Sequence, residues 1–219
     1  MSISKPFAPK LSREVIQRCF ERNPHGAGFA FAMDNKVSVV KGFFNPDELI
    51  QYYELIPPQA TILLHFRKAS AGEINVKSCH PFRINKDHVM VHNGTIMDFW
   101  DEKSSLSDTQ RFVNMYLRPI FKNDKYFWRR RTGKYTIGRI VWPGKCIVLR
   151  NNGDYVIFNE ELGVWDGDTW FSNDGFLDES YYCNTHYPRQ LTLPLEFVES
   201  KEEEEAVEIE FTRQQQLAE

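Results

Sequence analysis

The chain has 219 residues, of which 42% are hydrophobic and 14% aromatic, and its formal net charge is -3 at pH 7. A chain of this size can bury a substantial core as one domain with a small appendage. The charge does not indicate nucleic-acid or anionic-membrane binding. No apolar run approaches the roughly 18 residues of a membrane span, and no basic segment leads into an apolar one at the N-terminus. We therefore expect a soluble cytoplasmic protein without membrane association.

The cysteines are widely spaced and form no Cys-x-x-Cys pair: they are Cys19, Cys79, Cys146 and Cys183. This spacing argues against both a disulfide framework and a zinc ribbon. A single Cys-His pair is not a metal site, so we interpret Cys79 and His80 in "CHPF" as packing residues. The pair Cys183 and His186 is equally weak evidence for a metal site. We predict neither a metal site nor a cofactor.

The first third of the chain predicts two helices and a hairpin. Residues 11–22 have a cap candidate in Ser12 and an apolar face at helical spacing. Residues 28–44 form two alternating runs about an Asp-Asn pair, which predicts a hairpin. Residues 45–56 begin with Asn-Pro, a favourable start for a second helix.

The next segments predict strands that alternate with a helix. Residues 60–67 and 88–93 are short apolar strands of the kind found inside layered structures. Residues 107–121 open with Ser-Asp-Thr-Gln, a capping box, and predict a helix. Residues 145–159 predict a hairpin about Asn-Gly, and residues 169–173 predict one more strand. Paired strands separated by covering helices favour an α+β sandwich with antiparallel sheets inside and helices outside.

The periodic pattern of apolar residues ends at about residue 191, where an acidic run and a glutamine run begin. This composition is typical of a solvated tail or a partner-binding extension. We therefore predict one domain over residues 1–190 and an acidic, Gln-rich C-terminal extension over residues 191–219.

Polar groups stand where the predicted strands end and a helix begins. Arg67 ends one strand, Asn93-Gly94 ends another, and Asp108 lies in the first turn of a helix. Arginine offers a fork for a carboxylate, Asn-Gly two donors for an oxyanion, and aspartate an anion for an ammonium group. Together they are the parts needed to hold an α-amino acid and polarise its side-chain amide. Alternatively, Arg67 forms a surface ion pair, Asn93-Gly94 is a hairpin turn or strand end, and Asp108 is a helix-terminus charge.

The order of segments resembles the class II glutamine amidotransferases of the N-terminal-nucleophile hydrolase superfamily. It is most similar to the short standalone members found in bacteriophage genomes, which would place the protein in the host cytoplasm. The resemblance covers roughly residues 1–173 through "MSISKPF", "NPHGAGFAF", "LLHFRKASAG", "CHPF", "HNGTI" and "LSDTQRFV". It implies a four-layer αββα sandwich and hydrolysis of the glutamine side-chain amide, with release of ammonia.

The resemblance also implies roles for individual residues. Arg67 would bind the substrate carboxylate with Ser70 close by, Asn93 and Gly94 would form the oxyanion hole, and Asp108 would bind the α-ammonium group. Two positions depart from the family. Many relatives have Thr-His-Gly where this chain has Ser-Ala-Gly at residues 70–72, and many have aspartate at His25. We therefore assign no role to Arg22 or Asn23.

The nucleophile position holds Ser2, where the family has cysteine directly after the initiator methionine. Removal of Met1 would free the α-amine of Ser2 to serve as the base. A hydroxyl is harder to activate than a thiol, because its proton must be removed during attack. Ser2 is then a natural serine nucleophile, a replacement that silences the enzyme, or a mark of a natural pseudoenzyme.

Two other functions stay open. A catalytically silent member would serve as a binding or regulatory module. A nucleic-acid-associated protein would use the aromatic and arginine-rich segment 126–131, although the remaining sequence offers no matching basic surface, and this segment could instead be a helix face that neutralises the acidic tail. For the amidotransferase, we expect glutamine or a related γ-glutamyl amide as substrate. We also expect a separate synthetase as the ammonia acceptor, if there is one.

Overall fold

The computed structural model describes residues 1–69 and 73–177. Their strands form two sheets in which every pair is antiparallel. The first sheet has, in spatial order, β3 (Lys36–Phe43), β2 (Ala27–Met33), β4 (Thr61–Phe66), β1 (Ser2–Ser4), β10 (Thr169–Phe171) and β9 (Val164–Asp166). The second has β5 (Phe82–Arg83), β6 (His88–Asn93), β7 (Lys145–Arg150) and β8 (Tyr155–Phe158).

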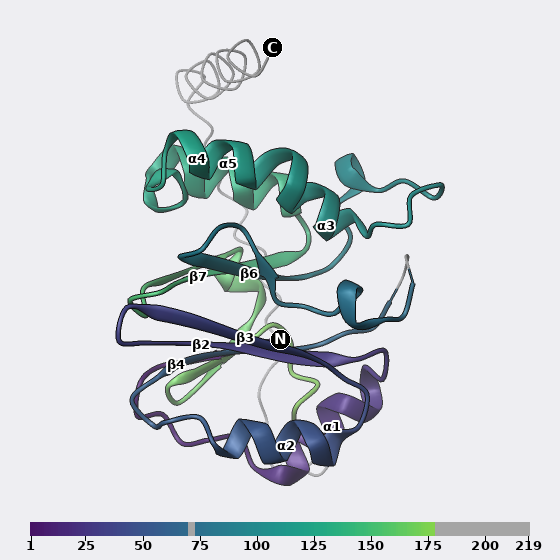
Figure 1. Ribbon diagram of the computed structural model, residues 1–219, viewed down its shortest axis with the longest axis vertical. Helices are drawn as coiled ribbons and strands as arrows, with labels where there is room; N and C mark the ends of the chain where they lie inside the picture. Colours follow the sequence, from purple (N-terminus) through teal and green to yellow (C-terminus); the bar gives the residue numbers. More distant parts are fainter. Residues whose placement is uncertain (70–72, 178–219) are drawn as a thin grey trace. The chain divides into compact units, whose positions relative to one another are not determined.

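The helices lie outside the two sheets, in two separate layers (Figure 1). The layer beside the first sheet contains α1 (Arg13–Arg22) and α2 (Pro46–Glu54). The layer beside the second sheet contains α3 (Asp108–Phe112), α4 (Arg118–Asn123) and α5 (Arg131–Val141). The predicted α+β class with antiparallel sheets inside and helices outside is therefore confirmed for the unit Met1–Phe176.

Strand alternation divides the side chains of the first sheet between two apolar layers. Ile3 and Leu63 face the second sheet and pack against Val91 and other residues of its inner surface. Leu64 faces the opposite way, into the cluster formed with α1 and α2. Because successive side chains of a strand point to opposite faces, Ser2 shares the α1–α2 side with Leu64, its partner in the β1–β4 ladder.

The local signals that we recognised produce the predicted caps and turns. The Ser12 hydroxyl accepts from the Val15 N–H at the start of α1, and the Asn45 side chain caps α2. Ser107 and Gln110 form a reciprocal capping box at the start of α3. The β2–β3 hairpin turns through two residues with positive φ, as its Asp-Asn sequence predicts.

Several features differ from the predicted elements or extend them. The strands β1, β5 and β9 and the helix α5 were not predicted. The helix expected over residues 107–121 is interrupted by a π-helical segment at Val113–Leu117, before α4 begins. Pro119 has no N–H to donate to the preceding turn, which fits the wider hydrogen-bonding pattern directly before it. Short 3-10 turns occur at Val76–Ser78, Met97–Phe99, Phe127–Arg129 and Glu160–Leu162.

The predicted boundary near residue 190 and the acidic extension lie outside the described residues, as do Ser70, Cys183 and His186. Within the described ranges, no helix is both long and apolar enough to cross a membrane. Cys79 and His80 are buried, as the interpretation of "CHPF" as packing residues predicts.

Candidate active site

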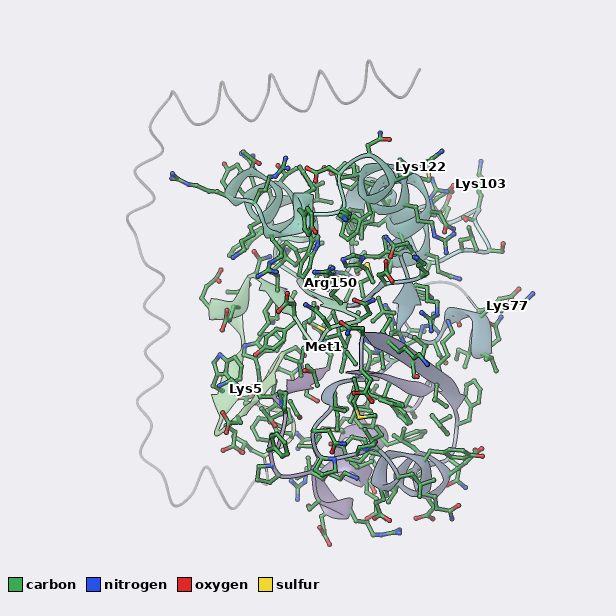
Figure 2. All side chains as sticks on the ribbon, turned by 60° about the vertical axis from the view of Figure 1, so that its left-hand side comes forward. Met1, Lys5, Lys77, Lys103, Lys122 and Arg150 are labelled. Atoms are coloured by element: carbon green, nitrogen blue, oxygen red, sulfur yellow. The ribbon has the colours of Figure 1, made fainter. Side chains whose placement is uncertain are left out.

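The N-terminus lies inside the first sheet. Strand β1 is hydrogen-bonded between β4 and β10, with Ser2 opposite both Leu64 and Phe171. The Met1 amine donates to Ser172 Oγ at 3.1 Å, and the Ser172 N–H donates to the Met1 carbonyl at 2.9 Å. Figure 2 shows Met1 at mid-height between the two helical layers. Burial lowers the pKa of the Met1 amine to about 6, so this amine is largely neutral at pH 7.

Four of the predicted site residues line one small cavity of about 80 Å³: Arg67, Asn93, Gly94 and Asp108. A larger cavity of about 520 Å³ is lined by Ser2 and, again, by Asn93. The structure therefore brings together every described residue that the sequence assigned to the site. Asn93 lies at the junction, between the nucleophile candidate and the charged residues of the small cavity.

Arg67 is only 4% exposed, which excludes the alternative of a surface ion pair. Its Nη1 donates to the Glu73 carbonyl at 3.1 Å. Burial lowers the pKa of the guanidinium, and the Asp108 carboxylate opposes this effect. A buried cation that faces a small polar cavity is suited to bind a carboxylate, because weak screening strengthens the attraction.

His25 holds the backbone at Arg67 and directly after it. The His25 N–H donates to the Arg67 carbonyl at 3.0 Å, and His25 Nδ1 accepts from the Ala69 N–H at 2.9 Å. This role was not predicted, because aspartate is common at the position in the family that the chain resembles. An imidazole nitrogen and a carboxylate oxygen can both accept this hydrogen bond.

Strand β6 ends at Asn93, and Gly94 continues with a φ of +137°. A Cβ atom on Gly94 would lie 2.7 Å from the Gly144 Cα, so glycine is required both by conformation and by space. The chain then enters a short helical turn rather than a partner strand. The hairpin alternative is therefore wrong, whereas a strand end with positive φ is confirmed. The Asn93 side-chain amide has no hydrogen-bond partner among the residues that the structure describes, and it borders both cavities.

Asp108 lies in the first turn of α3 with its carboxylate directed at a neighbouring loop. Its Oδ2 accepts from the Ile96 N–H at 2.6 Å, and its Oδ1 lies 3.4 Å from the Thr109 hydroxyl. A carboxylate has about four lone-pair sites, so these contacts leave room for a ligand ammonium group. Asp108 is thus more than a helix-terminus charge, because it also ties α3 to the loop that follows Gly94.

Three buried histidines also line the small cavity. His65 Nε2 donates to the His92 carbonyl at 2.9 Å, and the ring of His80 lies 4.1 Å from that of His65 between centroids. His92 Nδ1 lies 3.1 Å from Thr109 Oγ1. Burial lowers the pKa of all three, to about 4 for His92. Neutral imidazoles therefore support the cavity at pH 7.

The histidines were missed at the sequence level, although each belongs to a quoted segment: "HFR", "HPF" and "HNG". Three histidines in three such segments were a signal that could have been used. They do not form a metal centre, because no group of His, Cys, Asp or Glu in the described ranges has a suitable arrangement.

The aromatic and arginine-rich segment 126–131 lies in the α4–α5 layer. Phe127 and Trp128 are buried in the core below that layer. Arg129 and Arg130 form ion pairs of 2.6 Å with Asp154 and Asp124. The two buried rings are therefore not placed to stack on bases, whereas Tyr126 in the same segment is exposed.

No family model and no curated protein matches the chain. An assignment of function therefore depends on the chemistry of the residues around the two cavities.

Proposed function

We propose that the protein is a class II glutamine amidotransferase-type amide hydrolase, and that its layered fold is the four-layer αββα sandwich of N-terminal-nucleophile hydrolases. One observation carries this proposal: Asn93 links a cavity that contains Arg67 and Asp108 to a cavity that contains the residue directly after Met1. One substrate can thereby reach a guanidinium for its carboxylate, a carboxylate for its ammonium group, an amide donor for an oxyanion and a hydroxyl at the N-terminus.

The substrate is held at both charged groups of its α-carbon. Arg67 binds the α-carboxylate and Asp108 binds the α-ammonium group. The side-chain amide then reaches Asn93, where its carbonyl oxygen accepts from the Asn93 amide and the Gly94 N–H. These two donors stabilise the negative charge that develops on the oxygen during attack.

Ser2 supplies the nucleophile after Met1 has been removed. Its Oγ attacks the amide carbon, and its freed α-amine takes the hydroxyl proton and passes it to the leaving nitrogen. The carbon–nitrogen bond breaks, ammonia leaves, and an ester of Ser2 remains. Water then hydrolyses this ester to glutamate.

A catalytically silent binding protein is the second candidate, and the hydroxyl of Ser2 favours it. An amine of pKa about 8 readily activates a thiol of pKa about 8.5, whereas a hydroxyl loses its proton only during attack. A silent protein would keep the Arg67 and Asp108 contacts to an amino acid but release no ammonia. In the active case, ammonia is released or passed to a separate synthetase.

The decisive experiment is ammonia release from glutamine by the parent chain and by Ser2→Cys, after mass spectrometry has established that Met1 is absent. We expect strong activation in Ser2→Cys, because a thiol needs little help to ionise near neutral pH. Calorimetry with glutamine is run on both proteins. Binding without ammonia release from either one would favour the silent candidate, and neither binding nor release would refute both.

A further inference from the structure

The larger cavity exceeds what glutamine hydrolysis requires. Glutamine releases ammonia, a leaving group with one heavy atom, whereas the cavity beside Ser2 has a volume of about 520 Å³. The small cavity already contains Arg67 and Asp108, the groups suited to the glutamyl carboxylate and ammonium. With the glutamyl charges bound there, as the proposed function requires, the larger cavity is left for the leaving group of the amide bond.

The lining of the larger cavity is mixed, and part of it is apolar. Besides Met1, the large apolar side chains that line it are Leu11, Phe66, Phe171 and Phe176. The rings of Phe171 and Phe176 stack at 3.7 Å between centroids. Arg18 and Arg22 donate to the carbonyls of Phe176 and Gly175, so two side chains of α1 fix the wall. The pre-formed apolar wall that contains these rings favours an apolar ligand group in that part of the cavity.

The polar lining carries more positive than negative charge. Lys68 and Arg22 are the cations, and Glu21 is the acidic residue. Lys68 borders both cavities, and within the described part of the chain no ion pair or hydrogen bond occupies its amine. An anionic group on the ligand would therefore find a cation beside the apolar wall.

We propose that the substrates are γ-glutamyl dipeptides in which the leaving group is an apolar amino acid such as leucine. This inference rests on the proposed function, whose site it extends. The glutamyl part binds at Arg67 and Asp108, the leaving side chain packs against Phe171, and the leaving carboxylate pairs with Lys68. Ser2 Oγ attacks the γ-carbonyl carbon, the peptide nitrogen takes the proton through the Ser2 amine, and the free amino acid departs. Water then releases glutamate from the ester.

The test uses the full chain that carries Ser2→Cys and lacks Met1, and it compares three substrates. They are γ-glutamyl-leucine, γ-glutamyl-isoamylamide, which lacks only the second carboxylate, and glutamine. We expect kcat/KM for the dipeptide to exceed that for glutamine at least tenfold, with the amide in between. Lys68→Met should lower the ratio of dipeptide to amide at least fivefold. Lys122→Met is the matched control, because Lys122 lies on the α4 layer away from both cavities (Figure 2), and it should leave the ratio unchanged.

The outcomes separate this inference from the proposed function. Glutamine hydrolysed as fast as the dipeptide would overturn the inference and leave the amidotransferase proposal standing. An equal loss with all three substrates in Lys68→Met would place Lys68 at the glutamyl carboxylate and refute its assignment to the leaving group. Hydrolysis of none of them would refute both proposals. Calorimetry on the Ser2 chain adds a readout without turnover, in which γ-glutamyl-leucine should bind at least tenfold more tightly than glutamine.

Discussion

Asp108 Oδ2 accepts a hydrogen bond of 2.6 Å from the Ile96 N–H. This contact joins the first turn of α3 to the loop that leaves β6 after Asn93 and Gly94. The residue proposed to bind the substrate ammonium therefore also fixes the position of the proposed oxyanion hole. The two roles can be separated, because only the first requires a negative charge.

Asp108→Asn and Asp108→Ala should give different kinetic losses in the Ser2→Cys background. The asparagine keeps an oxygen that can accept from Ile96 but loses the charge, so we expect KM to rise at least tenfold with little change in kcat. The alanine also leaves the Ile96 N–H unpaired, which costs about 1 to 3 kcal/mol, and we expect kcat to fall as well. Steady-state kinetics and urea unfolding measure both effects. Identical kinetics for the two variants would show that Asp108 has a single role.

His25 should act on substrate binding through Arg67 without touching the substrate. His25→Ala removes the acceptor for the Ala69 N–H, so the backbone directly after Arg67 loses one of the two hydrogen bonds that hold it to His25. We expect KM for glutamine to rise several-fold while kcat stays within about twofold, as for loss of uniform binding. His25→Asp restores an acceptor and should return KM toward the parent value. An aspartate variant as impaired as the alanine variant would contradict this positioning role.

The local elements of the fold could be predicted because their signals are short-range. Ser12, Asn45 and the Ser107–Gln110 box occur where caps are needed, and their hydrogen bonds span two or three residues. Strand β1 could not be predicted, because three residues have no measurable period and the strand depends on β4 and on β10, more than 160 residues away.

The residues of the candidate site could be proposed from the sequence, but the shape of its cavities could not. Arg67, Asn93 and Asp108 stand in recognisable segments, and the structure places them around one cavity. The second cavity depends on the approach of α1 to the segment after β10, which no local pattern encodes. The contacts of His25 and of the three buried histidines are likewise tertiary, so their roles emerged only with the fold.

Gly94→Ala should be markedly more destabilising than Gly167→Ala. Both glycines have positive φ, but a Cβ at position 94 would lie 2.7 Å from the Gly144 Cα, whereas a Cβ at position 167 meets nothing within 4 Å. We expect about 1 kcal/mol at position 167 from backbone conformation alone and about 2 to 4 kcal/mol at position 94 from strain and overpacking together. Urea unfolding measures both values. Equal costs would mean that Gly144 moves aside without penalty.

Stability should fall steeply on acidification below about pH 6.5. Burial lowers the folded-state pKa of His65, His80 and His92 below the usual 6.5, to about 4 for His92. Between these values the unfolded chain binds more protons, so the free energy of unfolding rises with pH and is lost as pH falls. Each such proton contributes about 1.4 kcal/mol per pH unit.

His80→Phe isolates one of these protons. Both ring nitrogens of His80 lack hydrogen-bond partners in the described part of the chain, so phenylalanine removes no bond. We expect the slope of unfolding free energy between pH 4.5 and 6 to decrease by about 1.4 kcal/mol per pH unit. Titrating carboxylates are common to both proteins and cancel in the difference. Parallel pH profiles for parent and variant would show that His80 is protonated in the folded state.

Asn93→Ala in the Ser2→Cys chain should lower glutaminase activity about a hundredfold or more, the loss expected when one oxyanion donor is removed. Because the Asn93 side chain makes no hydrogen bond to any described residue, its truncation should leave the fold and its melting temperature almost unchanged. Asn123→Ala, at the end of α4, removes the same group away from both cavities and should retain full activity.

Ammonia release is measured after mass spectrometry has established the absence of Met1 and circular dichroism has established that the fold is retained. The loss should appear in kcat, because the donor acts on charge that develops during attack. Unchanged turnover in Asn93→Ala would reduce Asn93-Gly94 to a strand end and remove the oxyanion hole from the proposed mechanism.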